Sequence, residues 1–179
     1  MIDFLYDITQ QLESIKLPYM LSGSLAMGFY TIQRTTRDID LVVEIEQKDV
    51  LAIENIFKTD FYCHKPSIEE AIQRNGMFNV ISRKNGWKID FILRKNGEYD
   101  LIAFQRKKLL SLIENKPKLW VISLEDLIVA KLRWIQELKS ERQIEDIENL
   151  LDSKDLDVLY LDYWIKKLDL NTYSIDFHK

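Results

Sequence analysis

An alternating strand with two carboxylates on one face is the feature that most limits how this chain can fold. Asp38 and Asp40 are interleaved with the apolar residues Ile39, Leu41, Val43 and Ile45. Successive side chains of a strand point to opposite faces, so the apolar set faces a core and the two aspartates share the other face. Their Cα atoms then lie about 7 Å apart, within reach of one hard cation such as Mg²⁺. The alternative is a half-exposed strand with a solvated acidic face, and Asp-x-Asp alone favours that alternative.

A second predicted strand supplies a third carboxylate. One face of this strand is apolar and consists of Trp87, Ile89, Phe91 and Leu93. Asp90 therefore projects to the opposite face. An unpaired carboxylate in so apolar a strand costs several kcal/mol, and a metal shared with Asp38 and Asp40 removes that cost if the two strands are neighbours. The alternative is an ion pair with Lys88 or Arg94.

A glycine-serine pair precedes the acidic strand. Residues 18–22 predict a short strand, Gly23 permits a tight turn, and residues 25–30 predict the first turns of a helix. Ser24 then lies near a helix N-terminus, where unpaired N–H groups and the helix dipole favour an anion such as a phosphate. The alternative is a simple helix cap, which is the usual role of an isolated Gly-Ser pair.

Together, residues 21–24, residues 38–41 and Asp90 resemble the signature of the nucleotidyltransferase superfamily, which has the DNA-polymerase-β-like fold. In that family, a Gly-Gly or Gly-Ser turn precedes an Asp-hydrophobic-Asp/Glu-hydrophobic strand, and a later strand brings a third acid. Residues 34–37 resemble the small prokaryotic, minimal branch that includes toxin and antitoxin nucleotidyltransferases. Weaker similarity extends the match to residues 18–168.

The resemblance implies an α/β fold in which helices flank a mixed sheet. It also implies a Mg²⁺-dependent enzyme that moves a nucleoside monophosphate (NMP) from a nucleoside triphosphate (NTP) to a hydroxyl on RNA, a protein or a small molecule. The implied metal-binding and catalytic residues are Asp38, Asp40 and Asp90, and the implied nucleotide-binding residues are Gly23, Ser24, Arg37 and Lys131. The choice among ATP, CTP, GTP and UTP stays open. The alternative is a binding module, such as an antitoxin or regulator, that keeps the fold without turnover; the complete acidic set favours the enzyme.

Lys131 belongs to a predicted helix that starts at Ser123, where Ser123 and Asp126 form a capping-box-like pattern. Helical spacing places Lys131 within or beside the stripe that faces the core. A lysine there needs water or an anion for its ammonium group. The alternatives are a side chain that reaches past its apolar neighbours to water, and the triphosphate that the resemblance suggests.

The remaining pattern predicts an α/β core over residues 1–122 and a helical region over residues 123–179 packed on it. In the core we expect an amphipathic opening helix, a helix over residues 50–57, a shorter one after Pro66, and a strand over residues 118–122. Asn85-Gly86 predicts a hairpin that delivers Asp90 to the sheet. Residues 100–115 are ambiguous between a helix and a helix plus a strand.

Composition excludes several kinds of site. A chain of 179 residues, 46% hydrophobic, buries a sizeable core, and its net charge of −4 argues against indiscriminate nucleic-acid binding. Local RNA recognition and an antitoxin-type protein partner remain compatible with that charge. One cysteine and two histidines provide neither an intrachain disulfide nor a structural zinc site. The sequence shows no signal peptide and no membrane-spanning run, so the cytoplasm is the expected location.

Overall fold

The computed structural model describes residues 1–32 and 35–178. Arg34, the first residue of the segment that resembles the minimal prokaryotic branch, lies outside the described residues. Within them, no helix combines the length and the apolar character needed to cross a membrane.

A mixed β-sheet forms the centre of the protein. Its seven described strands lie in the order β3-β4-β5-β2-β1-β7-β6. The strands are β1 (Tyr19–Ser22), β2 (Asp38–Val43), β3 (Phe61–Tyr62), β4 (Met77–Ser82), β5 (Lys88–Leu93), β6 (Lys108–Leu110) and β7 (Leu119–Val121). β2 is parallel to β5 and β1 is parallel to β7, whereas the other neighbouring pairs are antiparallel. The predicted α/β fold with a mixed sheet is therefore confirmed.

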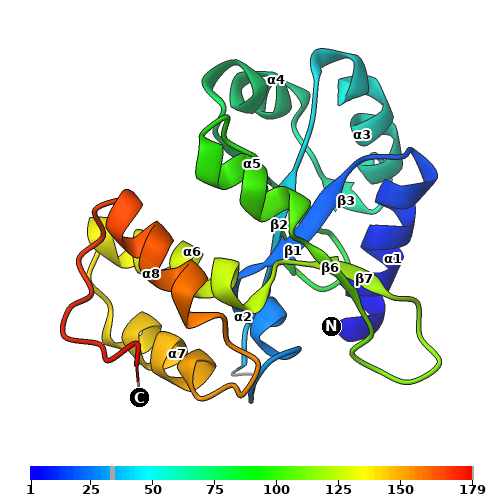
Figure 1. Cartoon of the computed structure of the whole chain (residues 1–179). Coiled ribbons are helices and arrows are strands. Elements are labelled where there is room, and N and C mark those ends of the chain that lie inside the picture. Colours follow the sequence, from blue (N-terminus) through cyan, green and yellow to red (C-terminus); the bar gives the residue numbers. More distant parts are fainter. Residues whose placement is uncertain (33–34, 179) are drawn as a thin grey trace.

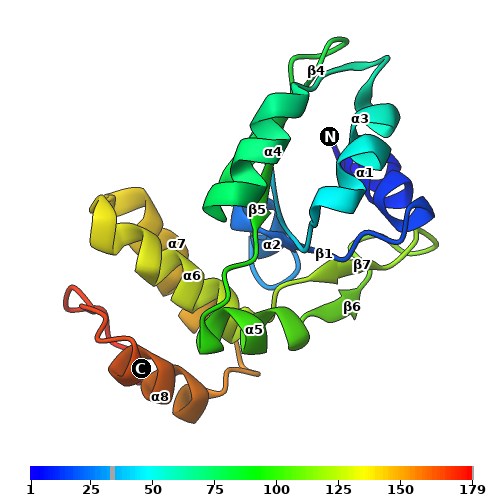
Figure 2. The same ribbon diagram turned by 90° about the horizontal axis from the view of Figure 1, so that it is seen from above.

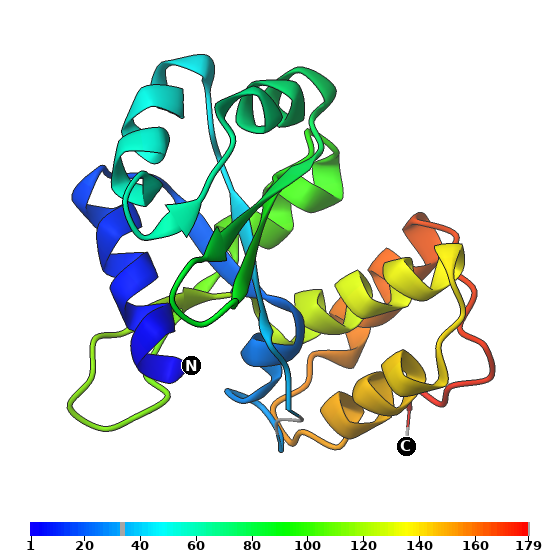
Figure 3. The same cartoon turned by 180° about the vertical axis from the view of Figure 1, so that it is seen from behind.

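Helices flank the sheet on both sides. They are α1 (Ile2–Ser14), α2 (Gly23–Met27), α3 (Val50–Phe57), α4 (Lys65–Arg74), α5 (Glu98–Gln105), α6 (Leu124–Glu137), α7 (Glu141–Leu151) and α8 (Val158–Lys167), with a short 3₁₀ turn at Gln47–Asp49. Figure 2 shows α1, α3 and α4 on one side of the sheet and α5 on the other. Figures 1 and 3 show α6, α7 and α8 as a group beside α2.

Local signals explain most of these elements. The Asn85-Gly86 hairpin forms as predicted: Gly86 has a φ of +69° and its N–H donates to the carbonyl of Ser82, so β4 and β5 pair antiparallel. α4 starts at Lys65 and is longer than expected, because Pro66 sits in the first turn, where a helix needs no N–H. The ambiguous stretch resolves into α5 followed by β6.

The passage from the sheet into the last three helices occurs at Ser123. Its Oγ accepts a hydrogen bond from the Asp126 N–H at 3.2 Å, as the capping pattern predicted. α6 packs against α2, α7 and α8. The division into a core over residues 1–122 and a helical region over residues 123–179 stays a prediction.

A buried ionic network, which we call the Arg106 network, ties α8 and the start of α6 to the end of α5. Arg106 Nη2 lies 3.0 Å from Glu125 Oε2, and Arg106 Nε lies 3.1 Å from Asp126 Oδ2. The Tyr160 hydroxyl donates to Asp126 Oδ1 at 2.7 Å, and the guanidinium lies 3.8 Å from the centre of the Tyr160 ring. The side chains of the two acids are 4% and 0% exposed. One guanidinium thus balances two buried carboxylates.

Candidate active site

The predicted acids lie where β1, β2 and β5 run side by side. Asp40 on β2 is the direct partner of Ser22 on β1 and of Asp90 on β5. Because neighbouring strands are only about 4.8 Å apart and paired residues share a face, the Asp40 and Asp90 side chains are neighbours. Asp38 lies two residues earlier on β2, opposite Lys88. The structure thus brings all three aspartates to one face, with Asp40 and Asp90 at its centre.

Gly23 allows Asp40 to lie against the backbone of β1 and α2. Its φ is +62°, and a Cβ atom placed there would lie 1.8 Å from Asp40 Oδ2 and 2.5 Å from Asp40 Cγ. Such distances are impossible between non-bonded heavy atoms, so only glycine fits beside the carboxylate. The sequence predicted Gly23 for its turn; the structure adds that its missing side chain makes room for Asp40.

Asp90 is buried and only partly satisfied. Its Oδ2 lies 2.8 Å from Lys88 Nζ, so the ion-pair alternative with Lys88 is present. The alternative with Arg94 is wrong, because Arg94 Nε instead bonds Glu44 Oε1 at 2.6 Å. The other oxygen, Asp90 Oδ1, is buried and has no hydrogen-bond partner among the described residues. A buried acceptor left in this state costs about 1–3 kcal/mol, so one more donor or a cation at this oxygen would stabilise the site.

The site disfavours the charged form of Asp40. Burial, followed by the charges of Asp90 and Asp38, raises the pKa of Asp40 from 3.8 to about 6, while Lys131 and Lys88 act in the opposite direction. The hydrogen bond to Asp90 is the main cause of the raised pKa of Lys88. Carboxylates crowded into a partly buried site create a demand for positive charge.

The donor set fits a hard divalent cation such as Mg²⁺. Three carboxylates offer the oxygen ligands that this ion prefers, and Asp90 Oδ1 is an unused acceptor. In their present positions, no three acidic, cysteine or histidine side chains among the described residues converge into a finished metal cage. The Lys88 ammonium, 3.7 Å from Asp38 Oδ1 and 2.8 Å from Asp90 Oδ2, lies on the acids instead.

The raised pKa of Asp40 predicts a pH-dependent response to Mg²⁺. Between pH 4 and about 6 the folded protein binds more protons than the unfolded chain, so without metal the free energy of unfolding falls as the pH rises through this window. A pKa change of this size corresponds to about 3 kcal/mol. Mg²⁺ should therefore raise the melting temperature little at pH 5 and clearly at pH 8.

Thermal unfolding of the wild type and of Asp40→Asn, with EDTA or with MgCl₂ from pH 4.5 to 8, checks this expectation. The variant lacks the titrating carboxyl, so without metal its stability should depend less on pH. Identical pH profiles for the two proteins would contradict the assignment of this shift to Asp40.

The other predicted site residues lie in different settings. Ser24 is buried in the first turn of α2, whose N-cap is Ser22, and Arg37 is exposed directly before β2. Lys131 is buried on α6 and donates to Asp146 Oδ2 at 2.7 Å and to Gln143 Oε1 at 3.0 Å. The buried Lys131 ammonium thus has a carboxylate of the protein as a partner, and its role in nucleotide binding stays a prediction. The charge of Lys131 still lowers the pKa of Asp40, so it acts on the acidic site.

Sequence reasoning named Lys88 as a partner of Asp90 but missed its contact with Asp38, and it missed Asp146 as the partner of Lys131. Lys88 precedes Asp90 by two positions on a strand, and this spacing already places both side chains on one face. Asp146 lies beside Ile147 and Leu150, in the buried stripe of α7. Asp146 is an acid within the apolar stripe of α7, and Lys131 is a lysine within that of α6. Two such residues of opposite charge could have indicated that the two helices pack together.

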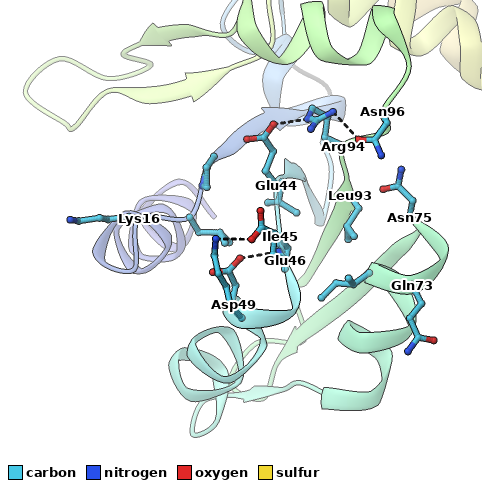
Figure 4. Close-up of a pocket in the computed structure, with 15 residues that line it drawn as sticks. Lys16, Glu44, Ile45, Glu46, Asp49, Gln73, Asn75, Leu93, Arg94 and Asn96 are labelled. Atoms are coloured by element: carbon cyan, nitrogen blue, oxygen red, sulfur yellow. Dashed lines mark hydrogen bonds and ion pairs between the residues drawn. The ribbon is translucent and has the colours of Figure 1, made fainter.

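A cavity at the other ends of β2 and β5 is separate from the acids. It has a volume of about 710 Å³ and is lined by residues that include Glu44, Leu93 and Arg94. Figure 4 shows that the Glu44 and Arg94 side chains are bonded to each other. The backbone N–H of Glu46 donates a hydrogen bond to Asp49 Oδ2. The Glu44 and Arg94 side chains of this cavity are already paired, whereas Asp90 carries an unused oxygen. The chemistry therefore places the candidate site at the acids.

Comparison with known proteins identifies the fold. No family model and no curated protein sequence matches the chain. The structure is similar to that of the antibiotic-resistance factor ANT(2'')-Ia, with a TM-score of 0.61 and 14% identity over 94% of this chain and 90% of that one. An antigenic nucleotidyltransferase-like protein from Paracoccidioides brasiliensis gives 0.54 and 17% over 93% and 88%. The lincosamide antibiotic adenylyltransferase LnuA gives 0.50 and 16% over 83% and 94%.

These similarities show that the chain has the nucleotidyltransferase fold, as the motifs led us to expect. The names of these three proteins describe none of them as a toxin or antitoxin, so the expected toxin and antitoxin branch stays a prediction.

Proposed function

We propose that this chain, with its nucleotidyltransferase fold, moves an NMP from an NTP to a hydroxyl group of a small molecule. The observation that carries the proposal is the pairing of Asp40 with Asp90 beside Gly23, where Asp90 Oδ1 is buried without a partner among the described residues. Two structurally similar proteins support the class of acceptor: ANT(2'')-Ia forms a complex with adenylyl-2''-tobramycin, and LnuA binds lincomycin. The net charge of −4 gives no electrostatic advantage toward a polyanionic acceptor.

The residues of the chain divide the work as follows. Asp38, Asp40 and Asp90 would hold Mg²⁺, which when bound stabilises negative charge on the attacking and leaving oxygens. The Asp90 carboxylate accepts the proton of the acceptor hydroxyl, whose oxygen attacks the α-phosphorus while the bond to the pyrophosphate oxygen breaks.

The nucleotide is held by the segment that joins β1 to α2 and by nearby cations. The N–H groups of Gly23 and Ser24 bind the triphosphate at the start of α2. Arg37, exposed beside the first acid, neutralises the departing pyrophosphate. Lys131 on α6 offsets the negative charge of Asp40, since it lowers the pKa of that carboxyl.

The test is transfer of label from each of the four α-labelled NTPs, with MgCl₂, to an aminoglycoside, a lincosamide, a structured RNA and a cell extract. We expect labelled small molecule and released pyrophosphate from the wild type. Asp90→Asn should lower the rate about 10²-fold, because it removes the proton acceptor. Asp155→Asn, at an exposed position, is the matched control and should keep the wild-type rate.

The outcomes separate the parts of the proposal. Label on RNA or protein would keep the transfer reaction and overturn the acceptor class. Equal rates for the wild type and a folded Asp90→Asn protein would contradict the role of Asp90. No label from any NTP would favour the non-catalytic binding module.

A further inference from the structure

One lysine occupies the position that a cation would take between the acids. Lys88 and Asp90 are two residues apart on β5, and Lys88 is also the direct partner of Asp38 on β2. The ammonium nitrogen lies 2.8 Å from Asp90 Oδ2 and 3.7 Å from Asp38 Oδ1. It thus contacts two of the three acids from a backbone position that the sheet fixes.

We propose that Lys88 is the built-in counter-ion of the acidic site, and that a divalent cation binds there only by displacing the Lys88 ammonium. This inference rests on the proposed function, because it concerns the same site. Lys88 is a positioning residue: it holds Asp38 and Asp90 in place in the metal-free protein and sets the affinity of the site for metal.

The charges explain why the two cations exclude each other. Three carboxylates within one small area repel one another, and one ammonium removes part of that repulsion. A metal ion held by Asp38 and Asp90 would draw on the same two carboxylates that Lys88 contacts and would lie within a few ångströms of the ammonium. In a partly buried site, repulsion between cations at such a distance is larger than in water, so both do not remain.

The side chain of Lys88 suits this exchange. It is 38% exposed, whereas that of Asp90 is 9% exposed, so the lysine is much more open to solvent than the aspartate. Its four-carbon stem is flexible, and its ammonium is a compact charge that regains water when released. When the ammonium leaves, Asp38 and Asp90 keep their places because the pairing of β2 with β5 fixes their backbone.

Calorimetric titration of the metal-free protein with MgCl₂, and with MnCl₂ followed by electron paramagnetic resonance, tests the proposal without any activity. We expect Lys88→Met to bind either ion about tenfold more tightly than the wild type, because no ammonium has to leave. Lys88→Arg keeps a cation and should not gain affinity. Lys84→Met, at an exposed position of the same hairpin, is the matched control and should bind as the wild type does.

Stability gives a second readout. In EDTA at pH 8, Lys88→Met should melt below the wild type, because the acids lose their counter-ion, and saturating MgCl₂ should raise its melting temperature more than that of the wild type. Equal or weaker metal binding by a folded Lys88→Met protein overturns the proposal. If that protein and the wild type still transfer NMP, the proposed function stands while this inference fails. If neither protein binds metal nor transfers NMP, both fail.

Discussion

Gly23→Ala is expected to lower NMP transfer about 10³-fold and to reduce the free energy of unfolding by about 1–2 kcal/mol. The added Cβ would lie 1.8 Å from Asp40 Oδ2, so the Asp40 carboxylate has to move by more than an ångström. A displacement of about 1 Å in a catalytic group already costs about 10²-fold, and here the displaced group also pushes toward Asp90. Transfer rates and urea unfolding measure the two effects.

Gly86→Ala is the matched control for this prediction. Gly86 has a φ of +69°, close to the +62° of Gly23, but no described atom lies within 4 Å of an added Cβ. The control therefore carries the same backbone strain without the collision, and it should lose stability but keep transfer. A second variant, Gly23→Ala with Asp40→Ala, removes the contacts at 1.8 Å and 2.5 Å and leaves one of 2.9 Å to the Asp40 Cβ, so it should regain part of the stability without regaining transfer. Full transfer by Gly23→Ala would show that Asp40 need not occupy this position.

Arg106→Met should destabilise the protein by about 3–5 kcal/mol, a large part of the stability of a typical domain. The substitution keeps a long apolar side chain but leaves Glu125 and Asp126 as buried carboxylates without their cation. It also removes the guanidinium from the Tyr160 ring of α8. Urea unfolding followed by circular dichroism measures the loss.

Two further variants isolate the buried charge as the cause. Arg74→Met breaks an ion pair in which the side chain of Arg74 is 77% exposed and that of Glu70 is 57% exposed. This substitution should lower the free energy of unfolding by no more than about 0.5 kcal/mol. Glu125→Gln in the Arg106→Met background removes one uncompensated charge and should recover part of the loss. A deficit as small as that of Arg74→Met would mean that the Arg106 network contributes little to the stability of the fold.

Local sequence patterns predicted the elements of the site better than its assembly. Alternation predicted which faces carry Asp40 and Asp90, and Asn85-Gly86 predicted the hairpin, because both depend on neighbours in sequence. That β5 lies next to β2, with Asp40 opposite Asp90, depends on the order of strands in the sheet. No local pattern encodes that order, so the distance between the acids was not predictable without the family resemblance.

The side chains that surround the acids show the same limit. The pattern of α6 predicts that Lys131 needs water or an anion, but its partner Asp146 comes from a different helix. Lys88 was considered only as a neutralising partner of Asp90, because its second contact, with Asp38, crosses between strands. When two charged groups meet only through tertiary structure, each sequence segment shows one charged residue but not its partner.

The parallel pairing of β2 and β5 also decides when the site comes into existence as the chain folds. α3, β3, α4 and β4 lie between these two strands in the sequence, whereas β4 and β5 form a local hairpin. Contacts that close such a long stretch of chain form slowly and late, because the entropy of the intervening chain is lost first. Until then Asp90 is apart from Asp38 and Asp40, and the three carboxylates do not form a shared ligand site. A cation binds these acids only after β2 and β5 have paired, so we expect it to stabilise the folded protein chiefly by slowing unfolding.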